Sequence, residues 1–499
     1  MLLAPLQHLL LAGLLGAGPG DCGMYLTKLA SLHQLTSDTS LLVNALSGAV
    51  DVVDNDLRTD LLQVALGGRP DVADAHRKAL IERGYLFADE GAERAALEEL
   101  YLAYERASGT RPMQFVLCPT YGCNLACSYC FEGSQLHSRP EVMSCQQVED
   151  AFAALRELCS AKPDRPRQVV LFGGEPLLPA TEQAVEAVLT LAAEGDIPVQ
   201  VVTNGTYLRR FISIFGRYPG VVRGVQVTLD GPREIHDARR SRRDGRGSFD
   251  EVADGVEACF EAGIGVNLRA NLDAQNVDCL EEFADLLGDL GWTGRSGFRC
   301  QLAPVTDHVG AATWPHLLRE DQLVEPVLAL WQRRPELRQV LDFRLFRVLH
   351  HLISVIEPQA REKTMPRFHY CEADRGDILT FGPDGLVYVC PESIGEPDNA
   401  VGTYSPDLQI SPARRRQWEE RSVLTLPECR ECNIATFCGG GCAYAALRQF
   451  GSPCHPVCAG APDVLRAYVD ALRDRSWTGG LPSGDRSTAV AGAPGRHDS

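Results

Sequence analysis

Apolar, β-branched runs recur between residues 112 and 310, and stretches with helical periodicity separate them. The apolar runs are 113–117, 168–172, 199–203, 225–229, 266–272 and 298–304, and examples of the helical stretches are 182–195 and 248–263. Such an alternation predicts βα units with a parallel sheet, in a barrel or a doubly wound α/β fold. Ligand-binding residues are then expected on the loops that follow the carboxyl ends of the strands.

The segment before this alternation has a different pattern. Residues 47–56 (SGAVDVVDND) predict a β-hairpin, residues 73–84 a helix that stops at Gly84, and residues 85–90 a short strand. A further helix is expected over residues 92–108 and leads into the next domain. We therefore predict a small α+β, winged-helix-like module over residues 24–108, with a generic helical cap on the barrel as the alternative.

Four other segments complete the predicted domain organisation. Residues 1–23 are an apolar leader without a basic start, or a misassigned start upstream of Met24, and they are too short to span a membrane comfortably. The alternating domain is placed at residues 109–310, followed by a helical bridge at 311–365 and a cysteine-rich domain at 366–475. The tail at 476–499 is rich in Gly, Ser and Pro, which predicts disorder.

Composition narrows the function. The chain has 499 residues and a formal net charge of −18, which argues against a nucleic-acid partner. Of its 18 cysteines, 8 fall between Cys371 and Cys458. In a cytosolic protein such runs bind metal more often than they form disulfides. We expect a cytoplasmic protein that binds no membrane.

The first cysteine group is the triplet Cys123, Cys127 and Cys130, which follows the first predicted strand of the alternating domain. Three thiolates on one short loop can bind three irons of a 4Fe–4S cluster and leave the fourth iron open. A zinc site that recruits Cys118 is the alternative, although Cys118 lies in an apolar strand, where a thiol is commonly just buried. The spacing favours the cluster.

The triplet and its setting resemble the signature of radical SAM enzymes. The resemblance implies a partial (β/α)6 TIM-like barrel and a catalytic cluster whose open iron binds S-adenosylmethionine (SAM). In that family an electron from the cluster cleaves SAM and releases a 5′-deoxyadenosyl radical, which removes a hydrogen atom from the substrate. The electron comes from a reductant such as flavodoxin or ferredoxin.

Short motifs after the later strands extend this resemblance. They resemble the family's GGEP, TNG, S-L-D-G and H-D-x-x-R segments, which bind the amino group, the ribose and the carboxylate of SAM. An arginine suits the carboxylate because its fork matches two oxygens. By this resemblance the expected SAM-binding residues are Gly173, Gly174, Glu175, Pro176, Thr203, Asn204, Thr228, Asp230 and Arg240, with Tyr129 and Phe131 beside the adenine.

The second cysteine group resembles the SPASM domain of radical SAM enzymes, which binds two auxiliary 4Fe–4S clusters and would bring the total to three. Carried over, the resemblance assigns Cys371, Cys390 and Cys442 to the first cluster. It assigns Cys429, Cys432, Cys438 and Cys458 to the second. The chain has no cysteine at residues 363–365, where some members carry one, so the first cluster has an open iron or takes Cys454 or another ligand. A pair of structural zinc sites is the alternative.

SPASM-type enzymes mostly modify peptides or proteins, which makes a precursor peptide the expected substrate. Residues 24–108 would then add the precursor's leader as an extra strand, and the product would be a thioether or a carbon–carbon crosslink. Glu392 is a candidate base. The runner-up is an anaerobic sulfatase-maturating enzyme, which carries Asp where this chain has Pro391 and begins closer to its first cysteine motif. A non-enzymatic iron–sulfur or zinc protein is the remaining alternative.

Overall fold

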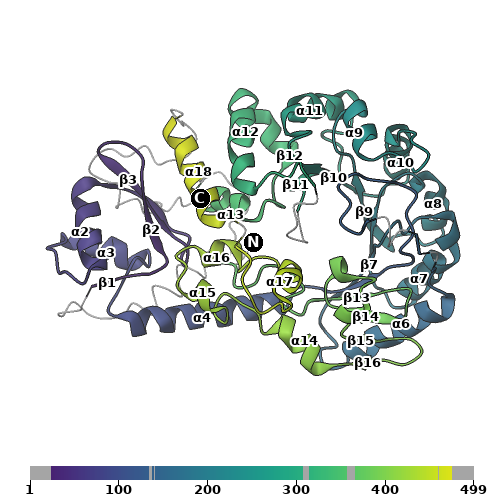
Figure 1. The fold of residues 1–499 in the computed structure, drawn as a ribbon, viewed down its shortest axis with the longest axis horizontal. Coiled ribbons are helices and arrows are strands. Elements are labelled where there is room, and N and C mark those ends of the chain that lie inside the picture. Colours follow the sequence, from purple (N-terminus) through teal and green to yellow (C-terminus); the bar gives the residue numbers. More distant parts are fainter. Residues whose placement is uncertain are drawn as a thin grey trace, which may run out of the picture.

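The structure, a computed structural model, describes residues 24–133, 138–139, 141–306, 314–356, 366–458 and 460–474 (Figure 1). The predicted leader at 1–23, the tail at 476–499 and the cysteine-free segment at 363–365 lie outside these residues. Within the described residues, no helix combines the length and the apolar character that crossing a bilayer requires.

An eleven-stranded sheet forms the centre of the molecule, with strand order β12-β11-β10-β9-β8-β7-β6-β13-β14-β15-β16. Every neighbouring pair from β12 to β13 is parallel. This confirms the predicted α/β class with a large parallel sheet. Six strands lie within two or three residues of the predicted runs: β6 (Met113–Leu117), β7 (Arg167–Leu171), β8 (Val199–Thr203), β9 (Val222–Thr228), β10 (Val266–Leu272) and β11 (Phe298–Pro304).

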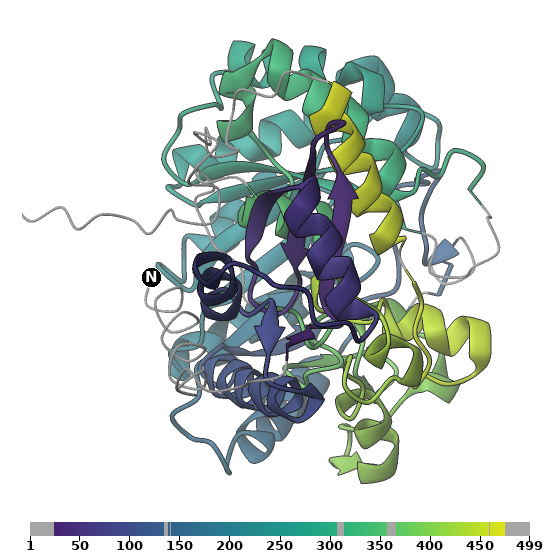
Figure 2. The ribbon, with the colours of Figure 1, turned by 90° about the vertical axis from the view of Figure 1, so that its left-hand side faces the viewer.

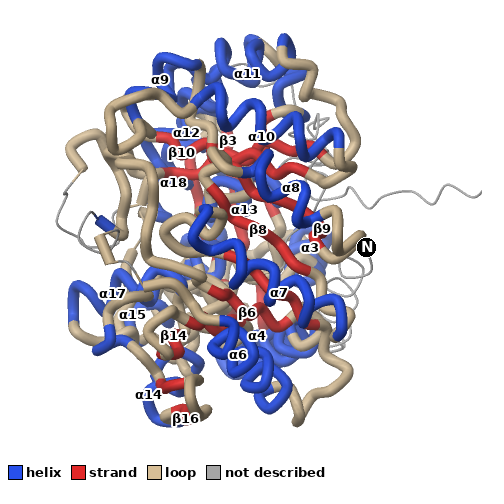
Figure 3. The backbone as a smooth tube through the Cα atoms, turned by 90° about the vertical axis from the view of Figure 1, so that its right-hand side faces the viewer, coloured by secondary structure: helices blue, strands red, loops and turns tan. Residues whose placement is uncertain are grey.

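Helices cover the outer face of this sheet, as the tube in Figure 3 shows. Each presents an apolar stripe; in α10, for example, the buried residues Phe249, Val252, Val256 and Cys259 recur at helical spacing. The covering elements are α6 (Cys145–Leu158), η1 (Pro179–Thr181), α7 (Glu182–Glu194), α8 (Leu208–Phe215), α9 (Arg233–Arg239), α10 (Phe249–Glu261), η2 (Val277–Cys279) and α11 (Leu280–Asp289). The loops at the carboxyl ends of the strands stay free to build a site.

The N-terminal module lies at one end of the long axis in Figure 1 and faces the viewer in Figure 2. Its elements are β1 (Tyr25–Leu26), β2 (Ala30–Gln34), β3 (Thr39–Asn44), β4 (Val50–Asp54), α2 (Asn55–Ala65), α3 (Asp74–Glu82) and β5 (Leu86–Phe87). β2, β3 and β4 form an antiparallel sheet, and β1 pairs with β5. One face of that sheet and the two helices enclose a small core of their own around Leu42, Leu61 and Tyr85.

Helix α4 (Glu90–Ser108) differs from the expected domain boundary. Its buried residues Ala96, Leu100 and Tyr104 belong to the main core rather than to the module's core. The small core of the module therefore ends at Leu86, and α4 runs along the body of the protein (Figure 1). Only part of the module packs in this small core, because Leu41, Val43 and Phe87 belong to the main core.

The bridge between the barrel and the cysteine-rich region is mostly helical, as expected, but not entirely. It contains α12 (Glu320–Arg333), η3 (Pro335–Gln339), β12 (Leu341–Asp342) and α13 (Arg347–Ile356), and β12 pairs with β11. Glu320 accepts the backbone N–H of Leu349 at 2.6 Å, at the start of α13. Burial raises the pKa of the Glu320 carboxyl to about 7.

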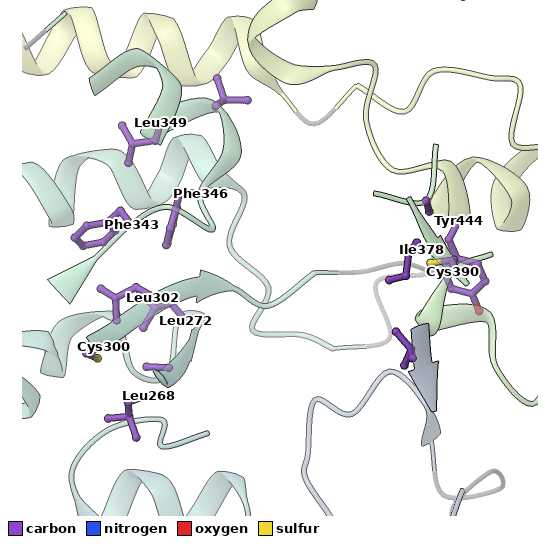
Figure 4. Packing of buried hydrophobic residues seen from close by; sticks show 14 of the residues in the cluster. Leu268, Leu272, Cys300, Leu302, Phe343, Phe346, Leu349, Ile378, Cys390 and Tyr444 are labelled. Atoms are coloured by element: carbon purple, nitrogen blue, oxygen red, sulfur yellow. The ribbon is translucent and has the colours of Figure 1, made fainter. Parts of the chain in front are cut away.

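The cysteine-rich region begins by extending the barrel sheet. β13 (Ile378–Phe381) pairs with β6 in parallel, and the antiparallel strands β14 (Leu386–Tyr388), β15 (Gly402–Thr403) and β16 (Gln409–Ile410) follow. Figure 4 shows Ile378, Cys390 and Tyr444 together, well away from the group that contains Leu268 and Phe343. The other elements are η4 (Pro391–Ser393), η5 (Pro397–Asn399), α14 (Pro412–Glu419), α15 (Pro427–Arg430), α16 (Ala435–Cys438), α17 (Ala443–Phe450) and α18 (Ala461–Asp474).

Candidate active site and iron–sulfur ligands

A cavity of about 220 Å³ opens at the carboxyl ends of the barrel strands. Most of the residues expected from the sequence border it: Cys123, Cys127, Tyr129, Cys130, Phe131, Gly173, Gly174, Glu175, Thr203, Asn204, Thr228, Arg240 and Glu392. Two expected residues, Pro176 and Asp230, are buried behind its wall. Glu392 is notable because it comes from the cysteine-rich region, which therefore contributes to the cavity.

Backbone hydrogen bonds fix the loop that carries the three cysteines. Ala126 donates to the carbonyl of Ser241 at 2.8 Å, and Ser128 donates to that of Arg239 at 3.1 Å. Burial is the main cause that raises the pKa of the Cys123 thiol to about 12 and that of Cys127 to about 11, and neighbouring thiols contribute to both shifts. The three sulfurs are thus mutual neighbours on one cavity wall. Cys118 is fully buried, donates to the Thr120 carbonyl and does not border the cavity.

The two glycines after β7 allow this loop to pack closely. A Cβ on Gly174 would stand 2.3 Å from the carbonyl oxygen of Tyr121, and one on Gly173 would stand 2.4 Å from the sulfur of Cys118. Gly173 also has a φ of +131°, which disfavours any side chain. The segment Gly173–Gly174 therefore lies directly against the cysteine loop.

Glu175 connects two strand ends. Its carboxylate accepts hydrogen bonds from the Thr203 hydroxyl and the Asn204 backbone N–H, both at 2.6 Å, and from the Leu177 N–H at 2.8 Å. The side-chain amide of Asn204 in turn lies 3.8 Å from the sulfur of Cys123. Burial raises the pKa of Glu175. The carboxylate therefore orders the strand ends next to the cysteine loop, and it still borders the cavity.

Tyr129 is the centre of a polar network behind the cysteine loop. Its hydroxyl donates to Asp230 and accepts from Arg240 Nη1 at 2.7 Å and from the Asn271 amide at 3.1 Å. Asp230 also accepts the backbone N–H of Asn271 and pairs with buried Arg239. Asp230 thus supports the wall from behind, while Arg240 borders the cavity.

The residues present fit a 4Fe–4S cluster with bound SAM. Three thiols border one cavity, and two glycines form a cradle that a Cβ would fill. Among the residues that the structure describes, no acceptor meets the buried Nε of Arg240, which leaves a cationic donor available for an anionic group. Across the described ranges, no three His, Cys, Asp or Glu side chains converge closely enough for a single metal ion.

Five polar residues of the cavity wall were not expected from the sequence: Glu132, Gln226, Arg269, Asn271 and Thr306. For the two on β10 a signal is present, because polar residues alternate with apolar ones along this strand (Asn267, Arg269, Asn271), and the even spacing puts them on one face. In a parallel barrel strand that face is the interior. In the sequence alone, the alternation predicts a strand and does not say which of its faces lines a cavity.

Seven of the eight C-terminal cysteines fall into two neighbourhoods. Cys371 and Cys442 both raise the pKa of the Cys390 thiol, which places these three together. Cys429, Cys432 and Cys458 likewise raise the pKa of Cys438. Cys454 is exposed and its sulfur faces the Gln417 carbonyl at 3.5 Å. The grouping is the same as the one the resemblance assigned, with no fourth cysteine in the first group within the described part of the chain.

One buried arginine ties the cysteine loops together. Arg421 is 1% exposed and donates to the carbonyls of Gly440 (2.6 Å), Pro453 (2.8 Å) and His455 (3.2 Å) and to the Asp374 carboxylate (3.2 Å). Asp374 in turn accepts the backbone N–H of Cys371 at 2.8 Å. A single guanidinium therefore holds the loops that carry cysteines of both groups.

An open parallel barrel with a cysteine triplet at its carboxyl edge is the arrangement expected of an iron–sulfur enzyme that cleaves SAM. Comparison with known proteins agrees: the description "Radical SAM superfamily" matches residues 117–287. The chain is a radical SAM enzyme related to SPASM-type peptide maturases such as PqqA peptide cyclase, and to AdoMet-dependent haem synthase.

Three similar proteins illustrate this relationship. Fe-coproporphyrin III synthase of Methanosarcina barkeri is 31% identical over 34% of this chain and only 39% of its own length. PqqA peptide cyclase of Ruegeria pomeroyi is 27% identical over 72% of this chain and 90% of its own. The crystal structure of Streptococcus suis SuiB bound to precursor peptide SuiA superposes with a TM-score of 0.51 at 15% identity, over 87% of this chain and 99% of that one.

Proposed function

We propose that this protein is a radical SAM/SPASM peptide maturase that forms a thioether or carbon–carbon crosslink in a ribosomal precursor peptide. The observation that carries the proposal is the single cavity in which the cysteine triplet, Glu175 and Arg240 meet Glu392 of the cysteine-rich region. When bound, the cluster and SAM supply a 5′-deoxyadenosyl radical. The chain itself has to orient SAM, keep water out and hold one C–H bond in place.

Each of these tasks has residues in the cavity wall. Arg240, held by Tyr129, would bind the SAM carboxylate, and Glu175 with the Gly173–Gly174 segment would bind the amino group. Thr203, Asn204 and Thr228 would face the ribose. Glu392 is the candidate base for a proton released as the crosslink forms. The two C-terminal cysteine groups would hold two auxiliary 4Fe–4S clusters that pass on the electron left by the substrate.

The N-terminal module supports a peptide as the substrate, because it offers a free sheet edge. The pattern of β3–β4 hydrogen bonds, set by the Asn44 N–H to Ala49 carbonyl bond, directs the backbone groups of Val52 away from β3. No backbone partner meets them among the described residues. A leader peptide that added a strand to β4 would pair with this edge. PqqA peptide cyclase, a relative matched over 90% of its length, acts on a peptide by its name.

The enzyme class is tested on anaerobically purified protein. We expect roughly twelve irons per chain if three clusters form, and 5′-deoxyadenosine from SAM after reduction with dithionite, flavodoxin or ferredoxin. Replacing Cys123, Cys127 and Cys130 with Ala should remove about four irons and all SAM cleavage. A colourless protein that leaves SAM intact would refute the proposal.

The peptide substrate is tested by co-expression with short reading frames next to the gene. Loss of two hydrogen atoms per crosslink, located by tandem mass spectrometry, is the expected product. Val52→Pro should then block modification, because proline removes the outward N–H of β4. Leu32→Pro is the matched control, since it removes an outward N–H from β2 at the opposite edge of the sheet. Equal loss in both variants would argue against leader binding at β4.

A sulfatase-maturating activity is the second candidate. Those enzymes carry Asp directly after the residue that matches Cys390, and here Glu392 brings a carboxylate from the next position into the cavity. A sulfatase-derived peptide should then gain an aldehyde, which a hydrazide probe detects. An aldehyde product without any crosslinked precursor would favour this candidate over the peptide maturase.

A further inference from the structure

The cavity contains a second arginine, Arg269, that the SAM-binding assignment leaves without a role. Arg269 lies on β10 and is in register with Thr228 of β9, whereas Asn271 lies two residues further toward the carboxyl end. At about 3.3 Å per residue, the backbone of Arg269 is roughly 7 Å deeper in the barrel than that of Asn271. Its side chain therefore joins the cavity wall at the level of Thr228 and reaches Asn271.

The guanidinium of Arg269 is only partly occupied. Arg269 borders the cavity, and its Nε donates to Asn271 Oδ1 at 2.8 Å. Within the described residues, no acceptor forms a hydrogen bond with its two terminal nitrogens. It forms no ion pair within 4 Å there either. A cationic fork with four N–H groups directed at a cavity is suited to bind two oxygens of one carboxylate.

The electrostatic surroundings separate the two arginines. Burial lowers the pKa of Arg269, Glu392, Tyr129 and Asp230 raise it, and the guanidinium of Arg240 lowers it. The Cys127 thiolate is the first of the groups that raise the pKa of Arg240, whereas Glu392 is the first for Arg269. SAM carries one carboxylate, to which Arg240 is assigned, and this leaves the fork of Arg269 for a different anion.

We propose that Arg269 anchors a carboxylate of the substrate in this cavity, with its guanidinium held by Asn271. This inference rests on the proposed function and adds the substrate's chemistry to it. Two parts of a peptide offer such a group: the side chain of an Asp or Glu near the reacting carbon, and the C-terminal carboxylate. The planar fork suits both equally well, and an experiment can separate them.

The test is ligand-observed saturation-transfer NMR on the anaerobic holoenzyme with SAM. The probes are N-acetyl-aspartate α-methylamide for a side-chain carboxylate, N-acetyl-alanine for a C-terminal one, and N-acetyl-asparagine α-methylamide as the neutral isostere. We expect one carboxylate probe to bind on the order of tenfold more tightly than the asparagine probe. The preferred probe identifies which carboxylate the substrate presents.

Two variants link the binding to Arg269. Arg269→Gln should abolish the preference, and Arg269→Lys should retain only part of it because the fork is lost. Arg299→Gln, an exposed arginine on the adjacent strand β11, is the matched control and should bind the probes like the wild type. Thermal melting of each variant checks that it is folded.

Three results would overturn the inference. They are equal binding of charged and neutral probes, no binding of any probe, and an Arg269→Gln variant whose SAM affinity falls about tenfold while its probe binding persists. The last result would assign Arg269 to SAM. Failure of the proposed function is recognised separately, as a wild-type holoenzyme that does not cleave SAM.

Discussion

Removing one hydroxyl group, in Tyr129→Phe, tests the network behind the cysteine loop. The ring stays, so packing against the loop is preserved, but three hydrogen bonds disappear. Arg240 Nη1 loses its only partner in the described structure, and Asp230 keeps the Asn271 N–H and Arg239. The effect should therefore fall mainly on Arg240 and on whatever Arg240 binds.

The magnitude follows from the charge of Arg240. A hydrogen bond to a charged group contributes about 1.5–3 kcal/mol. If about 2 kcal/mol of this is lost from the positioning of Arg240, the dissociation constant of SAM rises roughly 30-fold, since each 1.4 kcal/mol is a factor of ten. The loss at Asp230 should lower the stability of the folded protein by about 1 kcal/mol.

Equilibrium dialysis with labelled SAM on the anaerobic, iron-loaded protein measures the affinity, and iron content confirms that the cluster is intact. Tyr218→Phe is the matched control, because its hydroxyl contacts Thr190 at 2.8 Å near the amino end of β9, away from the cavity. The reasoning fails if Tyr129→Phe binds SAM as tightly as the control. It fails equally if the variant loses iron, since the cysteines would then depend on the hydroxyl.

Three further predictions concern the cluster loops and the bridge. Gly174→Ala places a Cβ 2.3 Å from the Tyr121 carbonyl oxygen, which should lower the free energy of unfolding by about 3 kcal/mol and deplete the iron of the SAM-binding cluster. Gly224→Ala is the control, because its Cβ would have no contact under 3.6 Å. Equal iron contents in the two variants would contradict the prediction. Arg421→Gln should remove up to eight irons of the two auxiliary sites and leave the SAM-induced EPR signal of the barrel cluster, and loss of that signal would show general unfolding instead. The Glu320 carboxyl has a pKa of about 7 in the folded protein and an ordinary value of 4.5 in the unfolded chain. The folded state therefore favours the protonated carboxyl, and this contribution to stability is fully present below pH 4.5 and is lost as the pH rises through 7. Glu320→Gln should therefore gain up to about 3 kcal/mol over the wild type between pH 5 and pH 8 in thermal melts, and a pH-independent difference would refute it.

The barrel could be predicted from the sequence because short strands rich in β-branched and other apolar residues alternate with helical stretches, as βα units require. β8 and β10 have the predicted bounds, 199–203 and 266–272. The cavity residues that follow strand ends could be found for the same reason. Arg269 could not, because its role depends on which face of β10 points inward, and periodicity alone does not decide that.

Elements outside the barrel were less predictable. Helix α2 begins at Asn55, and the Asp54 side chain accepts the Leu57 N–H at its start. The sequence pattern instead predicts the end of a hairpin at these residues. Strands β13 to β16 have only two to four residues each, too few for a period-2 pattern to show. Pairing with β6, not local sequence, makes β13 a strand. The side-chain contacts of Arg421 likewise join segments far apart in the chain and leave no local signal.

The pairing of β13 with β6 has a consequence for how the chain is made. Gln114 on β6 pairs with Ile378 on β13, 264 residues later in the chain. This edge of β6 is therefore covered only after β13 has been made. During synthesis from the amino end, a nearly complete barrel therefore exposes the unpaired edge of β6 until the cysteine-rich region has emerged from the ribosome. Exposed edges of this kind favour pairing with other chains. Shortened genes that end after the barrel should accordingly yield aggregated protein, and chaperones have a defined strand to protect in the full-length chain.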